Sequence, residues 1–166
     1  MPKQQQFSVL VDTSFLINLY NSKAHRHTEA KAYFKEFLDR GVTMYLSTIV
    51  VSEYQQKQPV TQMVNSKNYV ILPFNYRDAL KTAEMSYNLS NTDRVDGEDK
   101  ASCKDDLKLI GQAVEEGITW IITDDEKTLY KYTDQLQSAG IITVKPIALS
   151  AGVDKSIFNN GQAELI

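Results

Sequence analysis

The stretch Lys104–Thr128, KDDLKLIGQAVEEGITWIITDDEKT, decides the fold of this chain. Its first half places apolar residues at helical spacing and ends at Gly117, a pattern that predicts a helix of about 12 residues with a glycine cap. The run Ile118–Thr123 is short, β-branched and almost wholly apolar, which is typical of a strand buried on both faces of a parallel sheet. The stretch therefore predicts a helix that leads directly into a central strand.

Acidic pairs flank this helix and strand. Asp105 and Asp106 open the predicted helix, and Asp124 and Asp125 follow the strand. A helix of about 12 residues rises about 18 Å and a strand of about six residues returns about 20 Å, so the two pairs are expected to meet. They would meet at the carboxyl end of the strand, where open α/β sheets bind their ligands. The alternative is that the pairs only complement helix dipoles and cap helices.

The first predicted strand, Phe7–Val11, also ends at an acid. Asp12 follows it directly, and Thr13 and Ser14 then lead into a second apolar segment that predicts a helix. The two hydroxyls are suited to cap that helix or to hydrogen-bond a carboxylate or a water molecule. A simple N-cap is the alternative role for Asp12.

Glu53 is a further candidate for the same edge. It lies in a predicted helix that follows the strand Val42–Leu46, and its neighbours Val50, Val51 and Tyr54 are apolar. An exposed helical glutamate is the alternative, and composition does not separate the two.

The remaining segments complete an alternation of strands and helices. Strands are predicted at Tyr69–Leu72 and Ile141–Val144, the second ended by Pro146. This order predicts a three-layer α/β/α fold with a central, mostly parallel sheet and right-handed crossovers. We expect one domain over residues 1–146 and a tail over residues 147–166 that is partly ordered at best.

One helix joins the third strand to a charged loop. Asn75 is expected to cap a helix that runs from Tyr76 to about Leu89. Its apolar stripe is expected to comprise Ala79, Leu80, Ala83 and Tyr87. The polar stretch Ser90–Lys100 that follows is either a gate for substrate or a solvated connection.

Composition limits the classes of function. The chain has 166 residues, 42% of them hydrophobic, and a net charge of −3, which argues against a protein that mainly coats nucleic acid but allows a nuclease. No apolar run approaches about 18 residues and the start, MPKQQQF, has no apolar leader, so a cytoplasmic protein without a membrane partner is expected. Cys103 is interpreted as an incidental thiol. His25 and His27 lack partners at zinc-site spacing and fit phosphate contact better.

A site built from carboxylates, without Cys or His, indicates a hard cation. Mg²⁺ or Mn²⁺ is the cation that such oxygen ligands favour. A site of this kind suits phosphodiester hydrolysis, in which a metal polarises the phosphoryl oxygen, lowers the pKa of bound water and stabilises the leaving oxygen.

Four segments together resemble PIN domains, the small metal-dependent ribonucleases that include VapC-like toxins of toxin–antitoxin pairs. The segments are VLVDTSFLINLY, LSTIVVSEY, KDDLKLIGQA and IITDDEKT, in the order of the family and within about residues 7–145. The resemblance implies the same three-layer fold, a Mg²⁺ or Mn²⁺ site of three or four acids, and endonucleolytic cleavage of RNA. It also implies an antitoxin protein and a homodimer as partners to be tested.

The resemblance selects one acid from each pair. Asp106 is preferred to Asp105, because the family has apolar or small residues at +3, +4 and +7, where Asp105 would place Lys108 and Gln112. Asp125 is preferred to Asp124, because the strand motif is Thr, any residue, then Asp. The predicted catalytic and metal-binding residues are therefore Asp12, Glu53, Asp106 and Asp125, with Asp105 and Asp124 as substitutes and Thr13, Ser14 and Thr123 in support.

The chain departs from the family after the fourth acid. Family members commonly carry an Asp or His and then Phe shortly after it, whereas Lys127 and Thr128 stand at those places here. The substrate end of the site is therefore expected to differ. Lys104, Lys108 and Arg94 either contact phosphates or are solvated surface charges.

Two other classes of α/β protein with acids at strand ends do not fit this pattern. A receiver domain needs an acceptor Asp at the end of the central strand, but Ser47 and Thr48 follow Leu46; a haloacid-dehalogenase-type phosphatase needs Asp-x-Asp after the first strand, which Asp12 and Ser14 do not supply. The alternative that stays open is a catalytically weak PIN-like module that binds RNA or protein.

Overall fold

The computed structural model describes residues 6–90 and 100–159. The predicted loop Ser90–Lys100 falls almost wholly outside these residues, as do Arg94, the side chain of Cys103 and residues 160–166 of the predicted tail. The interpretations made for them stay predictions.

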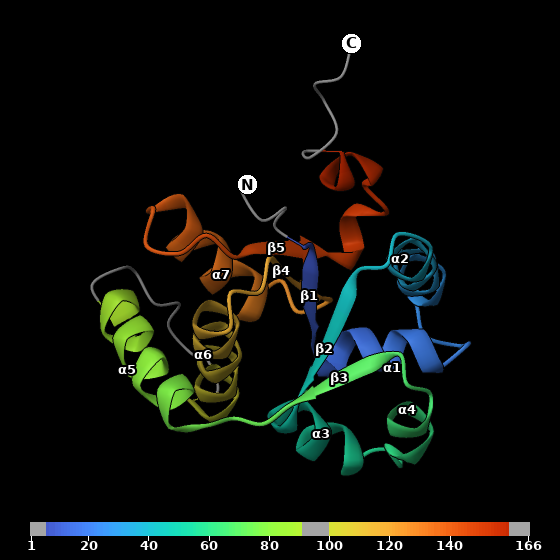
Figure 1. Cartoon of the computed structure of the whole chain (residues 1–166), viewed down its shortest axis with the longest axis horizontal. Helices are drawn as coiled ribbons and strands as arrows, with labels where there is room; N and C mark the ends of the chain where they lie inside the picture. The colour runs from blue at the N-terminus through green and yellow to red at the C-terminus, as the bar shows by residue number, and fades with distance from the viewer. Residues whose placement is uncertain (1–5, 91–99, 160–166) are drawn as a thin grey trace.

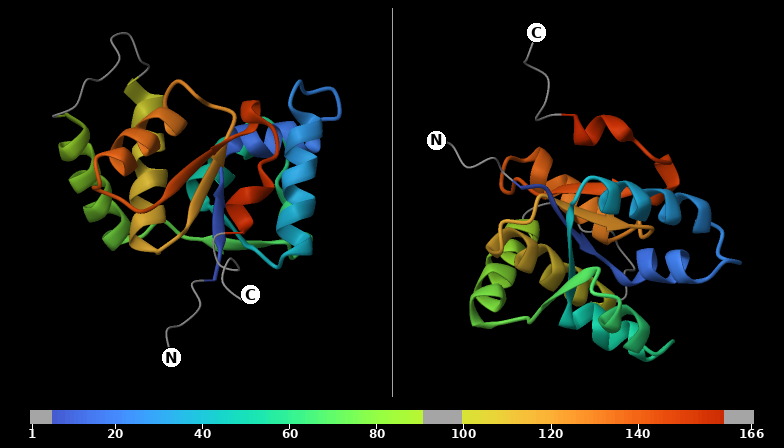
Figure 2. Two further views of the ribbon diagram at one scale, coloured as in Figure 1. Left: turned by 90° about the horizontal axis from the view of Figure 1, so that it is seen from above. Right: turned by 45° about the vertical axis from the view of Figure 1, so that its right-hand side comes forward.

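Five parallel strands form one sheet between two layers of helices (Figures 1 and 2). Its order is β3-β2-β1-β4-β5. The strands are β1 (Ser8–Val11), β2 (Thr43–Ser47), β3 (Tyr69–Leu72), β4 (Trp120–Thr123) and β5 (Lys145–Ala148). The three-layer α/β/α fold predicted from the alternation of elements is confirmed.

The helices divide between the two faces of the sheet, as the two sides of Figure 1 show. One face carries α1 (Thr13–Tyr20), α2 (His27–Asp39), α3 (Thr48–Gln55) and the short α4 (Thr61–Asn65). The other carries α5 (Tyr76–Ser90), α6 (Lys100–Glu115) and α7 (Leu129–Ser138). Because the chain leaves β1 towards one edge and later returns to β4 on its other side, the carboxyl ends of β1 and β4 form the switch point of the sheet.

The two central strands are the most deeply buried part of the core. All four residues of β1 and all four of β4 are buried. In the register of the sheet, Val11 lies opposite both Leu46 and Ile122. The residue that follows each of these strands is therefore fixed in position by core packing on both sides.

The key helix and strand form where the sequence predicts them, with shifted bounds. Helix α6 begins at Lys100, so Asp105 and Asp106 lie in its second turn rather than at its start. Gly117 has the left-handed φ of 67° expected of a cap, and the backbone N–H of Ile118 closes the helix by donating to Ala113 O at 2.9 Å. Strand β4 begins only at Trp120, because Ile118 is used in this closure.

The position predicted for the last strand, Ile141–Val144, is wrong. Strand β5 is Lys145–Ala148 and contains Pro146, which was expected to end it. The backbone N–H of Lys145 donates to Thr119 O at 3.0 Å, so the nitrogen of the next residue faces the free side of this edge strand. A proline is tolerated there because no partner needs its N–H.

The segment after Pro146 contributes to the core, contrary to its prediction as a tail. Two short 3₁₀ helices, η1 (Leu149–Ala151) and η2 (Lys155–Phe158), follow β5. Leu149 is fully buried, and the ring of Phe158 packs edge-on against Trp120 with centroids 5.6 Å apart. The packed structure therefore continues past the predicted boundary at residue 146.

Helix α5 buries a different face from the one predicted. Asn75 caps it as expected, accepting from the N–H of Asp78 at 3.2 Å, but Leu80 is 55% and Tyr87 71% exposed. The buried side instead carries Met85 and Leu89. The whole predicted stripe is exposed: Ala79, Leu80, Ala83 and Tyr87.

The packing of α5 against α6 depends on a glycine in α6. A Cβ on Gly111 would lie 2.7 Å from Thr82 Cα, so only glycine permits this close approach of the two helices. The contact turns the side of α5 that carries Thr82 towards α6, which leaves the apolar stripe facing solvent.

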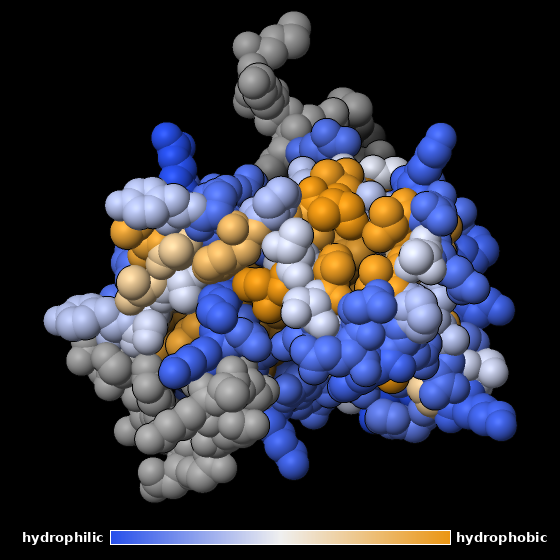
Figure 3. Space-filling model, turned by 90° about the horizontal axis from the view of Figure 1, so that it is seen from below, coloured by the Kyte–Doolittle hydropathy of each residue, from blue (hydrophilic) through white to orange (hydrophobic). Residues whose placement is uncertain are grey.

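Apolar side chains are also exposed along the free edge at β3. Val70 is 49% and Ile71 38% exposed there, and Val64 of α4 is 47% exposed. Figure 3, seen from the side where β3 and α3 lie in Figure 1, shows apolar residues gathered on this face. Within the described residues, no helix has the length and the apolar character that a membrane span needs.

Candidate functional site

A cleft of about 340 Å³ at the carboxyl edge of the sheet contains all four predicted acids. Asp12 follows β1, Glu53 lies in α3, Asp106 in α6, and Asp125 follows β4. The other side chains that line the cleft are Thr13, Ser14, Ile17, Gln56, Lys57 and Leu109. Four acids from segments far apart in the sequence thus share one cleft.

Asp12 is the N-cap of α1 and also the most buried acid of the cleft. It therefore serves both as a helix cap and as a residue of the site. Asp12 is only 5% exposed, and its Oδ1 accepts from Phe15 N at 2.8 Å. The hydroxyls of Ser14 and Thr123 also donate to its carboxyl group. Burial raises the pKa of Asp12 to about 7, although these hydrogen bonds oppose the rise.

Asp106 reaches the cleft from α6 with an oxygen that lacks a partner. Its Oδ2 is buried and accepts no hydrogen bond within the described part of the chain. Burial raises the pKa of Asp106 to about 7; the Thr128 hydroxyl opposes this rise, and the nearby charges of Asp125, Asp12 and Glu53 add to it. A buried acceptor without a donor is costly, and a cation or a proton would satisfy it.

The other two acids are held by hydroxyl groups. Glu53 is half-buried, and its Oε2 accepts from the hydroxyl of Thr13. Asp125 accepts at Oδ1 from Lys127 N at 3.0 Å and from Thr128 N at 3.1 Å, and at Oδ2 from the Thr128 hydroxyl at 2.8 Å. Both carboxylates are therefore oriented by the chain itself.

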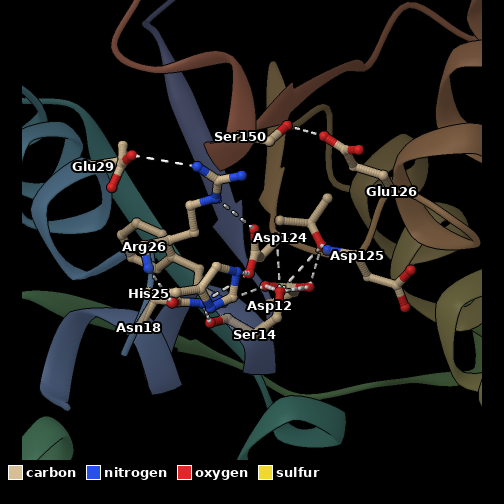
Figure 4. A network of polar contacts seen from close by, with 12 residues as sticks. Asp12, Ser14, Asn18, His25, Arg26, Glu29, Asp124, Asp125, Glu126 and Ser150 are labelled. Atoms are coloured by element: carbon tan, nitrogen blue, oxygen red, sulfur yellow. Dashed lines mark hydrogen bonds and ion pairs between the residues drawn. The ribbon is translucent and has the colours of Figure 1, made fainter. Parts of the chain in front are cut away.

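Ser14 and Thr123 join the ends of β1 and β4. Ser14 Oγ donates to Asp12, accepts from the backbone N–H of Asp124 at 2.8 Å, and lies 3.3 Å from Thr123 Oγ1 (Figure 4). Thr123 is fully buried and accepts from Asp125 N at 2.8 Å. These two predicted supporting residues thus fix the backbone on which two of the acids stand.

The two substitutes do not line the acid cleft. The carboxylate of Asp124 points towards α1 and the loop before α2 (Figure 4). Asn18 Nδ2 of α1 lies 3.2 Å from it, and His25 Nε2 and Arg26 Nε of the loop lie at 3.3 Å and 3.8 Å. Asp105 pairs with Lys108 at 2.8 Å and lines a neighbouring pocket. The preferred member of each pair is therefore the one that lies in the cleft.

Thr128 and Lys57 are site residues that the sequence analysis missed. Thr128 stood out only as a departure from the family, yet it is 9% exposed and its hydroxyl contacts both Asp125 and Asp106. The signal was available, since a Thr three residues after an Asp at a strand end can close a turn with that Asp. Nothing in the sequence marks Lys57 as a site residue, because it lies just after the end of α3 and belongs to no recognisable motif.

The cleft has the oxygen ligands that a hard divalent cation prefers, although its acids are not arranged as a formed metal site. Four carboxylates and the hydroxyls of Thr13 and Ser14 line it, and Asp106 Oδ2 has no hydrogen-bond partner among the residues that the structure describes. No three His, Cys, Asp or Glu side chains of residues 6–90 and 100–159 are already arranged as a metal site. His27 is engaged elsewhere, with Nδ1 2.9 Å from Asn18 O.

The fold resembles solved structures of VapC proteins. No protein-family model and no curated protein sequence matches the chain. Rickettsia felis VapBC2, bound to a DNA fragment from its promoter, matches with 13% identity and a TM-score of 0.57, covering 84% of this chain and 98% of that one. Haemophilus influenzae VapBC-1 matches with 14% identity and a TM-score of 0.55, covering 87% and 99%.

A third match is Mycobacterium tuberculosis VapC20, described as a toxin that cleaves the sarcin–ricin loop. Its identity is 17% and its TM-score 0.51, covering 83% of this chain and 99% of that one. The VapC-like PIN fold that the four motifs predicted is thereby confirmed. Identities this low show the fold alone.

Proposed function

We propose that this protein is an endoribonuclease that depends on Mg²⁺ or Mn²⁺. The observation that carries the proposal is the meeting of four acids, Asp12, Glu53, Asp106 and Asp125, in one cleft at the switch point of the sheet. One of their oxygens, Asp106 Oδ2, is buried and unsatisfied within the described part of the chain. The VapC-like fold supports it, since one matched structure is described as a toxin that cleaves the sarcin–ricin loop. We propose a cytoplasmic location as well, since RNA is available there as a substrate.

The four acids would hold the cation through carboxylate oxygens. Bound there, it would polarise the scissile phosphate and lower the pKa of the attacking water. The hydroxyls of Thr13, Ser14, Thr123 and Thr128 keep the carboxylates in orientation.

The pKa values of two acids affect this binding. Because Asp12 and Asp106 have pKa values of about 7, they hold protons over part of the neutral range and must release them when a cation binds. Lys57 lines the same cleft as the acids and can contribute positive charge beside the negatively charged phosphodiester.

The proposal is tested by RNA cleavage with matched variants. Wild type is incubated with a mixture of single-stranded and folded RNA in Mg²⁺, in Mn²⁺ and in EDTA, alongside Asp106→Asn and Asp134→Asn. Asp134 is an exposed acid of α7 and serves as the control substitution. We expect cleavage by wild type and Asp134→Asn only with metal, and none by Asp106→Asn; cleavage by Asp106→Asn at the wild-type rate would refute the site.

A binding module without catalysis is the second candidate. Two observations favour it. Among the described residues, no three acids are already arranged around a cation site. Asp12, Glu53 and Asp125 also have hydroxyl partners, which satisfy their carboxylates in part without a cation. If metal neither raises the melting temperature of wild type nor permits cleavage, this candidate replaces the nuclease.

An antitoxin protein is the partner that we propose, because two matched structures are VapBC complexes. The exposed apolar residues Val64, Val70 and Ile71 offer a surface that a protein can cover. The test is co-expression with small proteins encoded beside this gene, followed by a cleavage assay of any complex; an antitoxin must suppress cleavage. A homodimer is proposed as well and is tested by light scattering.

A further inference from the structure

A second, shallower pocket adjoins the acid cleft. Its volume is about 290 Å³, and Glu53 and Gln56 line both it and the cleft. The remaining lining residues are Thr48, Ile49, Ser52, Asp105 and Lys108. A substrate group placed in this pocket would therefore lie next to a phosphate placed in the cleft.

The charges of this pocket argue against a second phosphate. Two carboxylates, Glu53 and Asp105, stand against the single ammonium of Lys108. That ammonium is already paired, with Nζ 2.8 Å from Asp105 Oδ1. A phosphate would meet net negative charge, whereas a neutral group that carries both N–H donors and a carbonyl oxygen would find complementary partners.

The Asp105–Lys108 pair presents two kinds of group side by side. The carboxylate accepts only, the ammonium donates only, and both side chains are accessible, at 35% and 41% exposure. Lys108 contacts one oxygen of Asp105, so lone pairs on both carboxylate oxygens remain for a ligand. The pocket thus offers two adjacent acceptors next to one donor.

Among the four RNA bases, guanine matches this arrangement best. Its Watson–Crick edge carries two adjacent donors, N1–H and the N2 amino group, beside the O6 acceptor. Adenine and cytosine each place a ring-nitrogen acceptor beside their amino group, and uracil offers one N–H between two carbonyls. Reading this edge requires an unpaired base, which is the usual target of sequence-specific recognition of RNA.

Resting on the nuclease function proposed above, we propose that this pocket binds an unpaired guanine next to the scissile phosphate, with Asp105 accepting from N1–H and N2–H and Lys108 donating to O6. Gln56 and Ser52 lie at the same pocket and supply further polar contacts. The acid pair in α6 then divides its roles: Asp106 serves the cleft and Asp105 selects the base.

The experiment uses four unstructured RNA oligonucleotides that differ at one position. Each is a dodecamer of adenosine and cytidine with guanosine, inosine, adenosine or cytidine at that position. Binding of each to full-length Asp106→Asn is measured by fluorescence anisotropy, and cleavage of each by wild type is measured with Mn²⁺. Inosine lacks only the N2 amino group and therefore isolates one of the two donors.

We expect guanosine to bind between about fivefold and 150-fold more tightly than adenosine, the range of one good bidentate base contact. The added substitution Asp105→Asn is expected to remove most of this preference, because a carboxamide cannot accept two hydrogen bonds from adjacent donors, and inosine is expected to lie between guanosine and adenosine. Glu84→Gln is the control, since Glu84 forms a pair with Lys81 of similar spacing and length, 2.8 Å, on α5.

Equal binding of guanosine and adenosine would overturn the inference, as would a guanosine preference that survives Asp105→Asn. Failure of the nuclease function is recognised separately, because it would leave all four RNAs uncleaved by wild type while base preference in binding could still be measured. Cleavage without any base preference would keep the function and refute the pocket.

Discussion

Replacing Asp106 by Asn is expected to stabilise the metal-free protein, by an amount that grows as pH rises from about 4 to about 7. The pKa of Asp106 is raised from 3.8 to about 7, chiefly by burial. Between about pH 4 and pH 7 the native state therefore holds a proton that the unfolded chain has lost, so wild-type stability falls as pH rises through that window. Asn has the shape of the carboxyl group and no charge, and its contribution does not change with pH.

The magnitude follows from the difference in pKa. At 1.36 kcal/mol per pKa unit, a carboxyl with a pKa of about 7 instead of 3.8 loses at most about 4 kcal/mol when ionised in the folded state. Asp106 is only partly buried and shares the cleft with Asp12, so solvent screening and coupled titration reduce this value. We expect Asp106→Asn to exceed wild type by about 2 kcal/mol at pH 8.5 and by only about 0.5 kcal/mol at pH 4, close to the pKa of the carboxyl in the unfolded chain.

The assay is urea unfolding of both proteins in EDTA at pH 4 and pH 8.5, with Asp134→Asn as the exposed control. Adding Mn²⁺ should reverse the order at pH 8.5, because binding at 100 times Kd stabilises wild type by about 2.7 kcal/mol. The reasoning would be refuted by a variant that is less stable than wild type in EDTA at pH 8.5, or by a difference that is the same at both pH values.

Three further predictions concern Thr128, Asp124 and Gly111. Thr128→Val is expected to weaken Mn²⁺ binding about tenfold to 100-fold in a calorimetric titration, because the hydroxyl beside Asp125 and Asp106 is lost. Thr128→Ser keeps the hydroxyl and should bind like wild type, so equal affinities of the two variants would contradict the prediction. Asp124→Asn is expected to keep Mn²⁺ affinity and to cost about 1 kcal/mol of stability through its contacts with Asn18 and Arg26, whereas a loss of affinity would show that Asp124 ligates the metal. Gly111→Ala should cost about 1–3 kcal/mol in thermal unfolding, since its Cβ would lie 2.7 Å from Thr82 Cα, and adding Thr82→Ala should not restore stability because the clash is with backbone.

The site residues that directly follow buried strands could be predicted from the sequence. Asp12 and Asp125 could be placed because β1 and β4 are runs of buried residues, and the edge at which each ends follows from parallel pairing. Asp106 was chosen over Asp105 by the spacing of the apolar residues after it, and the helix does turn Asp106 into the cleft. Glu53 could not be decided, because whether a helical glutamate faces a site depends on how its helix packs.

Other features depend on contacts between distant segments, which local pattern does not carry. The exposed stripe of α5 looks like a core face until Gly111 of α6 is known to draw the opposite side of the helix inwards. Pro146 looks like the end of a strand in the sequence. It is tolerated within β5 because β5 is an edge strand, which the local sequence does not reveal. Phe158 gives no periodic signal, since its burial comes from single contacts with Trp120 and Phe37.

Each acid of the cleft is paired with a hydroxyl of the chain, and this pairing explains how the acids can share a cleft before a cation arrives. A hydroxyl can donate to an ionised carboxylate, which lowers its pKa, while burial and neighbouring charge raise it. For Asp12 and Asp106 the balance falls at about 7, so either acid can hold a proton when the cleft has no cation and release it when one binds. A cleft lined by apolar side chains instead would keep these acids neutral at higher pH. The hydroxyls of Thr123, Ser14 and Thr128 therefore help to set the pH at which Asp12 and Asp106 become able to bind a metal, and Thr128 has no counterpart in the family pattern.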